Sequence, residues 1–173
     1  MFERITEGTF DEIFPLLEAA FPVTELRVKE DQRRLLQEEA YRLYGVRKDG
    51  SFAAVFATWE IDDFLYIEHF AVREDCRNGG YGGELLDRLL KEKGRPMVLE
   101  VEVPEDTLTC RRVRFYERHG LVYNDYPYLQ PPLREGNELL PLRFMTYPAA
   151  VDEQTYERYK KQMYQIVYQY EGD

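Results

Sequence analysis

A cluster of glycines in the middle of the chain joins a long apolar strand to a leucine-rich helix, and this junction constrains the fold most. Residues 64–72 alternate between two faces as a β-strand does, and the leucines at 85–90 repeat at the spacing of one helical face. A second apolar strand is predicted at 97–103. A strand, a helix and a strand in succession form a crossover between parallel strands. The sequence therefore predicts a parallel pair near the centre of a sheet.

Segments on both sides of this unit predict further strands and helices. The strands are expected at 2–6, 41–47, 52–61, 121–126 and 140–147. The helices are expected from a capping box at Thr9 and Glu12, at 25–40, at 108–119 and at 152–170. The predicted order is β-α-α-β-β-β-α-β-α-β-β-α, an α/β fold with a mixed sheet. We expect one domain at 1–148, with 149–173 forming a C-terminal helix packed on it.

Composition and charge restrict the classes of function. Hydrophobic residues make up 44% and charged residues 32% of the 173 residues, which is typical of a globular protein. The formal net charge of −10 disfavours a nucleic-acid partner, because phosphates would be repelled. Cys76 and Cys110 have neither a CxxC spacing nor a His at metal-ligand spacing, so we expect reduced thiols and no metal site. No segment has the ~18 apolar residues of a membrane span, and we expect a cytoplasmic protein without a membrane partner.

Arg77, Gly80 and Gly82 form the pattern R-x-x-G-x-G directly before the leucine-rich helix. Glycines let the backbone approach a ligand closely, and the first turn of a helix offers unpaired N–H groups to a phosphate. Arg77 would add charge-assisted hydrogen bonds. The loop has neither the Gly-Lys-Ser/Thr of a Walker A loop nor the context of a Rossmann fingerprint. It predicts a pyrophosphate site, and the alternative is a tight strand-to-helix turn without a ligand.

Two blocks of the sequence resemble the GNAT superfamily of acyl-CoA-dependent N-acyltransferases. Residues 67–86, IEHFAVREDCRNGGYGGELL, are similar to the family's acyl-CoA-binding motif, an apolar strand followed by Q/R-x-x-G-x-G/A and a leucine-rich helix. Residues 111–120, RRVRFYERHG, resemble a later helix of the family that ends in F/L-Y-E-K/R-x-G-F, with Leu121 in place of the final Phe. The resemblance implies a mixed sheet whose two central parallel strands splay apart and admit a pantetheine arm.

The same resemblance implies acetyl-CoA as the cosubstrate and no metal. The residues expected to hold it are Phe70, Ala71 and Val72 along the pantetheine, and Arg77, Asn78, Gly79, Gly80, Tyr81, Gly82 and Gly83 around the pyrophosphate. Thr109 and Arg112 stand where many members of the family carry Asn and Ala, so the contacts to the lower part of the cofactor would differ.

Three side chains are candidate catalytic residues. Tyr116 lies where the family often places a tyrosine near the CoA sulfur, and its hydroxyl would protonate the leaving thiolate. Glu68 lies beside the acyl-binding segment, where an acid in several members meets the acceptor amine, and Glu100 on the next strand is the second choice of base. The alternatives are a packed tyrosine, a carboxylate paired with an Arg, and a solvated strand face. Strict alternation would put Phe70 on the face of Glu68 and His69 on the opposite face.

The sequence therefore predicts an N-acetyltransferase that moves an acetyl group from acetyl-CoA to a primary amine of a small molecule or peptide. The alternatives are a non-catalytic acyl-CoA-binding regulatory module and the same fold with a longer acyl-CoA donor. The acceptor pocket is expected from 21–27, the turn at 59–63 and the aromatic stretch at 123–132. The tail helix would cover the acceptor side, contact a second subunit or simply dock on the sheet, so a monomer and a homodimer both stay open.

Overall fold

The computed structural model describes residues 1–172; Asp173, the last residue of the expected 149–173 segment, lies outside the described residues. The strands are β1 (Glu3–Arg4), β2 (Tyr41–Lys48), β3 (Ser51–Glu60), β4 (Leu65–Val72), β5 (Met97–Glu102), β6 (Val122–Gln130) and β7 (Leu140–Tyr147). The helices are α1 (Glu7–Ala20), α2 (Lys29–Arg34), α3 (Tyr81–Lys93), α4 (Thr107–Arg118) and α5 (Glu153–Ile166). Short 3₁₀ turns follow α2 and β4, and the order of elements is the predicted one.

The strands form one mixed sheet in the order β1-β2-β3-β4-β5-β7-β6. Among the strands of residues 1–172, β4 and β5 are the only parallel neighbours. Their pairing runs from Leu65 opposite Met97 to Ile67 opposite Leu99, and it ends there although both strands continue. The two strands therefore separate beyond Ile67 and Leu99. This is the predicted splay, and the mixed α/β fold class is confirmed.

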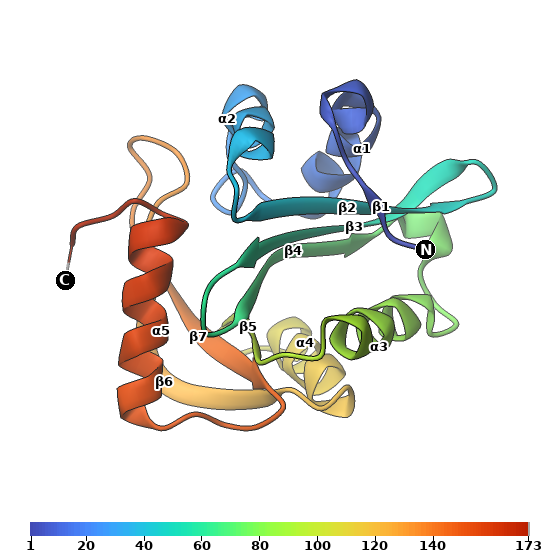
Figure 1. Ribbon diagram of the computed structural model, residues 1–173. Helices are drawn as coiled ribbons and strands as arrows, with labels where there is room; N and C mark the ends of the chain where they lie inside the picture. Colours follow the sequence, from blue (N-terminus) through green and yellow to red (C-terminus); the bar gives the residue numbers. More distant parts are fainter. Residues whose placement is uncertain (173) are drawn as a thin grey trace.

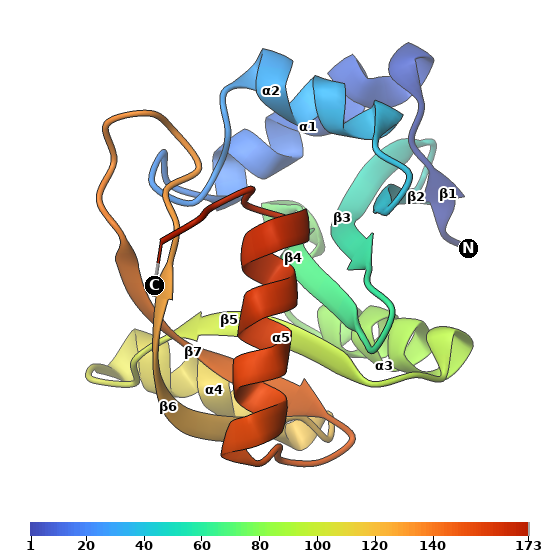
Figure 2. The same cartoon turned by 60° about the vertical axis from the view of Figure 1, so that its left-hand side comes forward.

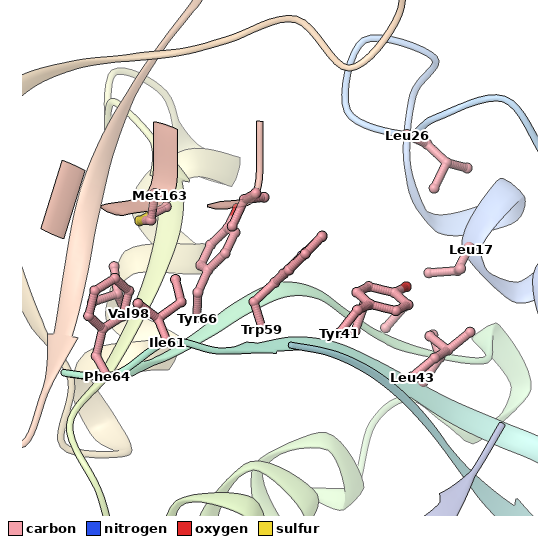
Figure 3. Packing of buried hydrophobic residues seen from close by; sticks show 14 of the residues in the cluster. Leu17, Leu26, Tyr41, Leu43, Trp59, Ile61, Phe64, Tyr66, Val98 and Met163 are labelled. Carbon is pink, nitrogen blue, oxygen red and sulfur yellow. The ribbon is translucent and has the colours of Figure 1, made fainter. Parts of the chain in front are cut away.

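Helices cover both faces of the sheet (Figures 1 and 2). α1, α2 and α5 lie on one face, and α3 and α4 lie on the other. The first face carries a continuous hydrophobic core, which packs against α1 at one end of the sheet and against α5 at the other. Figure 3 shows this core extending from Leu17 and Leu26 to Met163 of α5, with Trp59 and Tyr66 between them. The C-terminal helix is thus packed on the same core as α1.

The second core lies between the sheet and the helices α3 and α4. Leu86 and Leu89 of α3 are completely buried there, together with Met97 of β5. Gly94 ends α3 in the left-handed conformation, with a φ of 56°, as glycine commonly does at this position. The leucine-rich face predicted from the sequence therefore packs on the central parallel strands and fixes the start of α3 beside the splay.

Three helices have boundaries that differ from the prediction. The tail helix expected at 152–170 ends at Ile166. Thr6, and not Thr9, is the N-cap of α1, and the N–H of Thr6 donates to Thr9 Oγ1 at 3.1 Å. The helix expected at 25–40 is reduced to α2 and the 3₁₀ turn that follows it. Val28 is extended, and the residues before it form a loop in which Leu26 is buried. Burial of this loop against the sheet outweighs the helix propensity of its residues.

A β-bulge in β4 changes which of its side chains share a face. Two consecutive residues of β3 lie opposite Ile67 and His69, so Glu68 is the extra residue of β4. Glu68 and His69 both contact the loop between α1 and α2, whereas Phe70 packs into the second core. The expectation that His69 points away from Glu68, and that Phe70 shares its face, is therefore wrong. The bulge shifts the alternation by one residue, and hydrophobic periodicity gives no signal for it.

Candidate active site

The loop between β4 and α3 presents its backbone at the start of the helix. Asn78, Gly79 and Gly80 have consecutive positive φ values of 70°, 83° and 86°. Glycine adopts this conformation freely and asparagine tolerates it, which explains the residue types at these positions. Gly80 is the N-cap of α3, and it has no side chain that could bond to the free N–H groups of the first turn. These N–H groups and the helix dipole fit a phosphate group.

The other residues of the motif hold the loop against its neighbours. The Nε–H of Arg77 donates to the Val72 carbonyl at 2.8 Å, which fixes this exposed side chain at the end of β4. A Cβ at Gly82 would lie 3.3 Å from Val72 Cγ2, and a Cβ at Gly83 would lie 2.6 Å from the His119 ring. Gly82 and Gly83 therefore permit close packing of α3, while Gly79 and Gly80 permit the left-handed turn.

The two predicted acids lie where the central strands separate. Pairing ends at Ile67 and Leu99, and the next residues along the two strands are Glu68 and Glu100. Both side chains lie on the face covered by α1, α2 and α5. The side chain of Glu68 is only 1% exposed although the residue as a whole is half-buried, so its accessible surface is mainly backbone. The splay therefore exposes backbone groups of β4 that a ligand can bind.

Glu68 forms a buried ion pair with Arg27 from the loop between α1 and α2. The Arg27 Nη1 and Nη2 atoms lie 2.9 Å and 2.8 Å from the two Glu68 carboxylate oxygens, and Trp59 Nε1–H donates to Oε2 at 3.3 Å. Burial raises the pKa of Glu68, but the positive charge of Arg27 and the hydrogen bonds from Arg27 and Trp59 outweigh it and lower the pKa overall. Glu68 is therefore an ionised carboxylate whose negative charge is already neutralised.

Glu100 has a different environment. Its Oε1 accepts hydrogen bonds from the Tyr66 and Tyr168 hydroxyls, the latter at 2.7 Å, and from Gln130 Nε2 at 3.1 Å. Its Oε2 is buried and has no hydrogen-bond partner among residues 1–172. Burial raises the pKa of this carboxyl above its usual value, although the hydrogen bonds counteract the effect. Glu100 can therefore exchange a proton closer to neutral pH than an exposed glutamate does.

Tyr116 lies on the other side of the splay. It is a half-buried residue of α4 that packs against the second core, with its ring 5.2 Å from the Phe115 ring. Burial raises the pKa of Tyr116 to about 12, so its hydroxyl is protonated at neutral pH. Tyr116 and the two acids thus approach the sheet from opposite faces. The structure does not bring Tyr116 together with Glu68 and Glu100 in one cluster.

His69 is a completely enclosed histidine beside Glu68. Its Nε2 lies 2.7 Å from the Glu25 carbonyl, and its ring packs edge-on against Phe21 at 4.6 Å. Burial lowers the pKa of His69 despite the nearby Glu68 carboxylate, which favours the neutral ring. His69 therefore helps to fix the loop between α1 and α2 on the sheet, where Arg27 meets Glu68.

A pocket of about 220 Å³ lies on the face of the two acids, between α2 and the end of the chain. Its lining includes Arg27 and Trp59, which contact Glu68, and Tyr168, which contacts Glu100. Two of the three segments expected to build the acceptor pocket, 21–27 and 59–63, contribute to this lining. A larger hollow of about 990 Å³ runs along the outer side of α5, but the lining of that hollow includes none of the predicted site residues among residues 1–172.

Sequence reasoning missed the partners of the two acids. A buried glutamate on a strand signals that a cation or hydrogen-bond donors must lie nearby, but the sequence does not identify Arg27 as that cation. The sequence predicts a tail helix at 152–170, which would keep Tyr168 in helical register. The helix ends at Ile166, so Tyr168 leaves the helical register and turns toward Glu100. Both partners depend on long-range contacts that periodicity does not encode.

Within residues 1–172, no group of three or more His, Cys, Asp or Glu side chains is arranged to hold a metal ion. None of the helices in that part of the chain is long and apolar enough to cross a membrane.

The sequence matches known acetyltransferases. The family model described as the acetyltransferase (GNAT) family matches residues 10–121. YjbC of Bacillus subtilis strain 168, an acetyltransferase by name, is 36% identical over 100 residues, which are 57% of this chain and 50% of that protein. An amino-acid acetyltransferase of Azotobacter vinelandii is 30% identical over 122 residues, which are 69% of this chain and 27% of that protein. The chain therefore spans half or less of the length of these curated relatives.

Solved structures match over more of the chain. A GNAT family protein from Bacteroides thetaiotaomicron, named as an acetyltransferase, has a TM-score of 0.91 and 34% identity, with coverage of 97% of this chain and 98% of that one. A GNAT acetyltransferase from Elizabethkingia anophelis with acetyl-CoA bound has a TM-score of 0.59 and 21% identity over 84% of this chain and 95% of that one, which supports the fold alone. With its family model matching more than half of the residues, this chain belongs to the GNAT family of acetyltransferases.

Proposed function

We propose that this protein transfers an acetyl group from acetyl-CoA to a primary amine of a small molecule or peptide, by direct attack in a ternary complex. One observation carries the proposal. The central parallel strands β4 and β5 separate just beyond Ile67 and Leu99, beside a helix whose first turn follows three residues with positive φ. A separation between two parallel strands, next to a helix start with free N–H groups, fits a long thiol cosubstrate that carries a pyrophosphate.

The backbone around the splay would hold acetyl-CoA. The N–H groups from Asn78 to Gly83 would bind the pyrophosphate, and Arg77, fixed by its bond to Val72, would add a positive charge. The backbone of Phe70, Ala71 and Val72 would pair with the amides of the pantetheine as a strand does. The accessible backbone at Glu68 supports this arrangement, because Glu68 is the first residue of β4 beyond the pairing with β5.

The arrangement of the two faces of the sheet supports a model in which acetyl-CoA and the acceptor amine approach from opposite faces. Tyr116 and the start of α3 belong to one face, and Glu100 and the pocket of about 220 Å³ belong to the other. The amine nitrogen would attack the thioester carbon from the pocket side. Its proton would pass to Glu100, the carbon–sulfur bond would break, and the CoA sulfur would take a proton from Tyr116. The acetyl group would thus cross the sheet at the splay.

Glu100 is the better supported base of the two acids. Oε2 of Glu100 and Oε1 of Glu68 both lack a hydrogen-bond partner among residues 1–172, but Arg27 Nη2 lies 2.8 Å from the Glu68 oxygen, so the Glu100 oxygen is the one with a lone pair that no cation holds. A raised pKa also brings a carboxyl closer to the pH at which a base is most effective. Glu68 is ionised, but Arg27 contacts both of its oxygens. We therefore assign proton removal to Glu100 and the positioning of Arg27 at the pocket wall to Glu68.

Binding of acetyl-CoA is the first test. Acetyl-CoA at 100 times its Kd should raise the thermal midpoint by about 5–10 °C through mass action. Gly82→Glu should abolish this rise, because the added carboxylate would repel the phosphates and its Cβ would lie 3.3 Å from Val72 Cγ2. Gln154→Glu is the matched control, since it adds the same charge at the second position of another helix, α5. Differential scanning fluorimetry measures all three proteins.

Catalysis is tested separately from binding. Release of free thiol from acetyl-CoA would be followed with a panel of amines that includes a free amino acid, a polyamine and a short peptide. A thermal shift without thiol release for any amine would favour a non-catalytic acyl-CoA-binding module. The absence of any thermal shift with CoA or acetyl-CoA would contradict the proposed cosubstrate itself.

Tyr116→Phe should lower kcat by about tenfold to a hundredfold. This loss is at or below the low end of the range for general acid–base catalysis, because a thiolate is a good leaving group and needs little help from an acid. The KM for acetyl-CoA should stay unchanged, since the hydroxyl acts only on the leaving sulfur. Tyr123→Phe is the control, because Tyr123 is also half-buried against the second core but lies on β6. Steady-state kinetics give both constants. An equal loss in the two variants would mean that packing, and not proton transfer, explains the effect.

A further inference from the structure

The residues after α5 form an ordered turn against the sheet. The N–H of Tyr168 donates to the Met163 carbonyl at 3.2 Å, and the N–H of Tyr170 donates to the Tyr164 carbonyl at 2.8 Å. Gln169 has a positive φ of 48°, which bends the chain sharply between these two bonds. Figure 2 shows this turn at the end of α5, on the side of the helix that faces α2. The backbone thus holds Tyr168 in one place.

The hydroxyl of Tyr168 lies at the centre of a hydrogen-bond network around Glu100. It donates to Glu100 Oε1 at 2.7 Å, lies 2.9 Å from the Tyr66 hydroxyl and accepts from Gln130 Nε2 at 3.2 Å. Tyr168 is also part of the lining of the pocket of about 220 Å³, together with Trp59. Glu100 is therefore separated from this pocket by a single side chain.

We propose that Tyr168 is a positioning residue for the acetyl transfer, which holds the Glu100 carboxyl directly behind the wall of the acceptor pocket with Oε2 left free for the amine proton. The inference rests on the proposed function, in which Glu100 is the base. Tyr66, Tyr168 and Gln130 all bond to Oε1, whereas Oε2 has no hydrogen-bond partner among residues 1–172, and the nearby Tyr128 hydroxyl also lacks one. The segment after α5 would thus complete the active site in addition to stabilising the fold.

The titratable and polar groups around Glu100 set the pKa of its carboxyl. They come from β4, from β6 and from α5 with the residues that follow it, and they are Tyr66, Glu68, Tyr128, Gln130, Tyr164 and Tyr168. Glu68 is the only other carboxylate among them within residues 1–172, and its pair with Arg27 weakens its repulsion of Glu100. Hydroxyl donors favour the ionised form of Glu100, whereas burial favours the neutral form.

Tyr168→Phe tests the proposal because it removes the hydroxyl and keeps the ring. Loss of one donor to the carboxylate should raise the pKa of Glu100, so the acidic limb of the kcat/KM profile should move to higher pH by about one unit. Gln130→Met removes another donor and should move the limb in the same direction. Carboxyl carbon NMR of labelled protein should report the same rise for Glu100 without reference to activity. The thermal shift with acetyl-CoA should stay unchanged.

Tyr156→Phe is the matched control. Tyr156 is a buried tyrosine of α5, and its hydroxyl donates to the Pro127 carbonyl at 2.8 Å. Its variant should keep the wild-type pH profile even if its thermal midpoint falls. A Tyr168→Phe profile and Glu100 titration that superimpose on the wild type would overturn the positioning role. The absence of acetyl transfer by the wild-type protein would instead overturn the proposed function, so the two failures can be told apart.

Discussion

Glu100→Gln is expected to lower kcat/KM for the acceptor amine by about 10²–10⁴-fold, the usual contribution of a general base. Glutamine has the same shape and its carbonyl can accept the hydrogen bonds of Tyr66 and Tyr168, but it cannot take a proton. The thermal shift with acetyl-CoA should be preserved, because Glu100 is not part of the glycine loop. Steady-state kinetics with a saturating donor and a varied amine measure the loss.

The pH dependence of the wild-type enzyme follows from the same residue. Glu100 must be ionised to accept a proton, so kcat/KM should fall as the pH drops through its folded pKa. Burial raises that pKa, and the acidic limb should therefore lie above the range of an ordinary glutamate. In Glu100→Gln this limb should disappear from the residual activity.

Two further glutamates serve as controls for this result. Glu102 follows Glu100 by two residues on β5, but its side chain is exposed and pairs with Arg112 at 2.6 Å. Glu102→Gln should therefore leave kcat/KM nearly unchanged. Glu68→Gln should affect the KM for the amine more than kcat, because it loosens Arg27 at the pocket wall. If Glu68→Gln loses activity while Glu100→Gln keeps it, the base is Glu68, which the sequence placed first.

The parts of the fold that depend on local pattern could be predicted from the sequence. The strand at 64–72, the glycine loop and the leucine face at 85–90 lie in one continuous stretch, and each element signals the next. A crossover between parallel strands follows from that order alone. The start of the helix could be expected for the same reason, whereas the splay of the two strands was implied only by the resemblance to the GNAT superfamily.

The arrangement around the acids could not be predicted, because it depends on contacts between distant segments. The bulge at Glu68 depends on how β3 and β4 pair, and it reverses the face of His69. Arg27 is 41 residues from Glu68 and Tyr168 is 68 residues from Glu100. A pattern with a period of two or 3.6 residues carries no information about such pairs. Residue types indicated that acids were present, but only the packing shows which acid is neutralised.

Arg27→Leu is expected to destabilise the protein by about 3–5 kcal/mol at neutral pH, because removal of one partner leaves a buried charge without compensation. The Arg27 side chain is 9% exposed and the Glu68 side chain 1% exposed, so water cannot replace the lost partner. Arg112→Leu is the control, since Arg112 pairs with Glu102 at an exposed site and should contribute only about 0–1 kcal/mol. Urea denaturation gives the free energy of unfolding for each protein.

The pH dependence separates an unpaired charge from a simple loss of packing. In the wild type the pKa of Glu68 is lowered by folding, so the stabilising contribution of Glu68 is present above its unfolded pKa and is lost as the pH falls through its folded pKa. Without Arg27, the hydrogen bond from Trp59 would remain, but burial would dominate and raise the pKa of Glu68, so the carboxyl of the folded variant would become neutral at a higher pH than in the wild type. The gap in stability between wild type and Arg27→Leu should therefore narrow below about pH 4. A second replacement, Glu68→Leu, should recover much of the loss at neutral pH, because it removes the unpaired charge. A gap that is independent of pH, with no recovery in the double variant, would contradict this account and would mean that Arg27 stabilises the loop by packing alone.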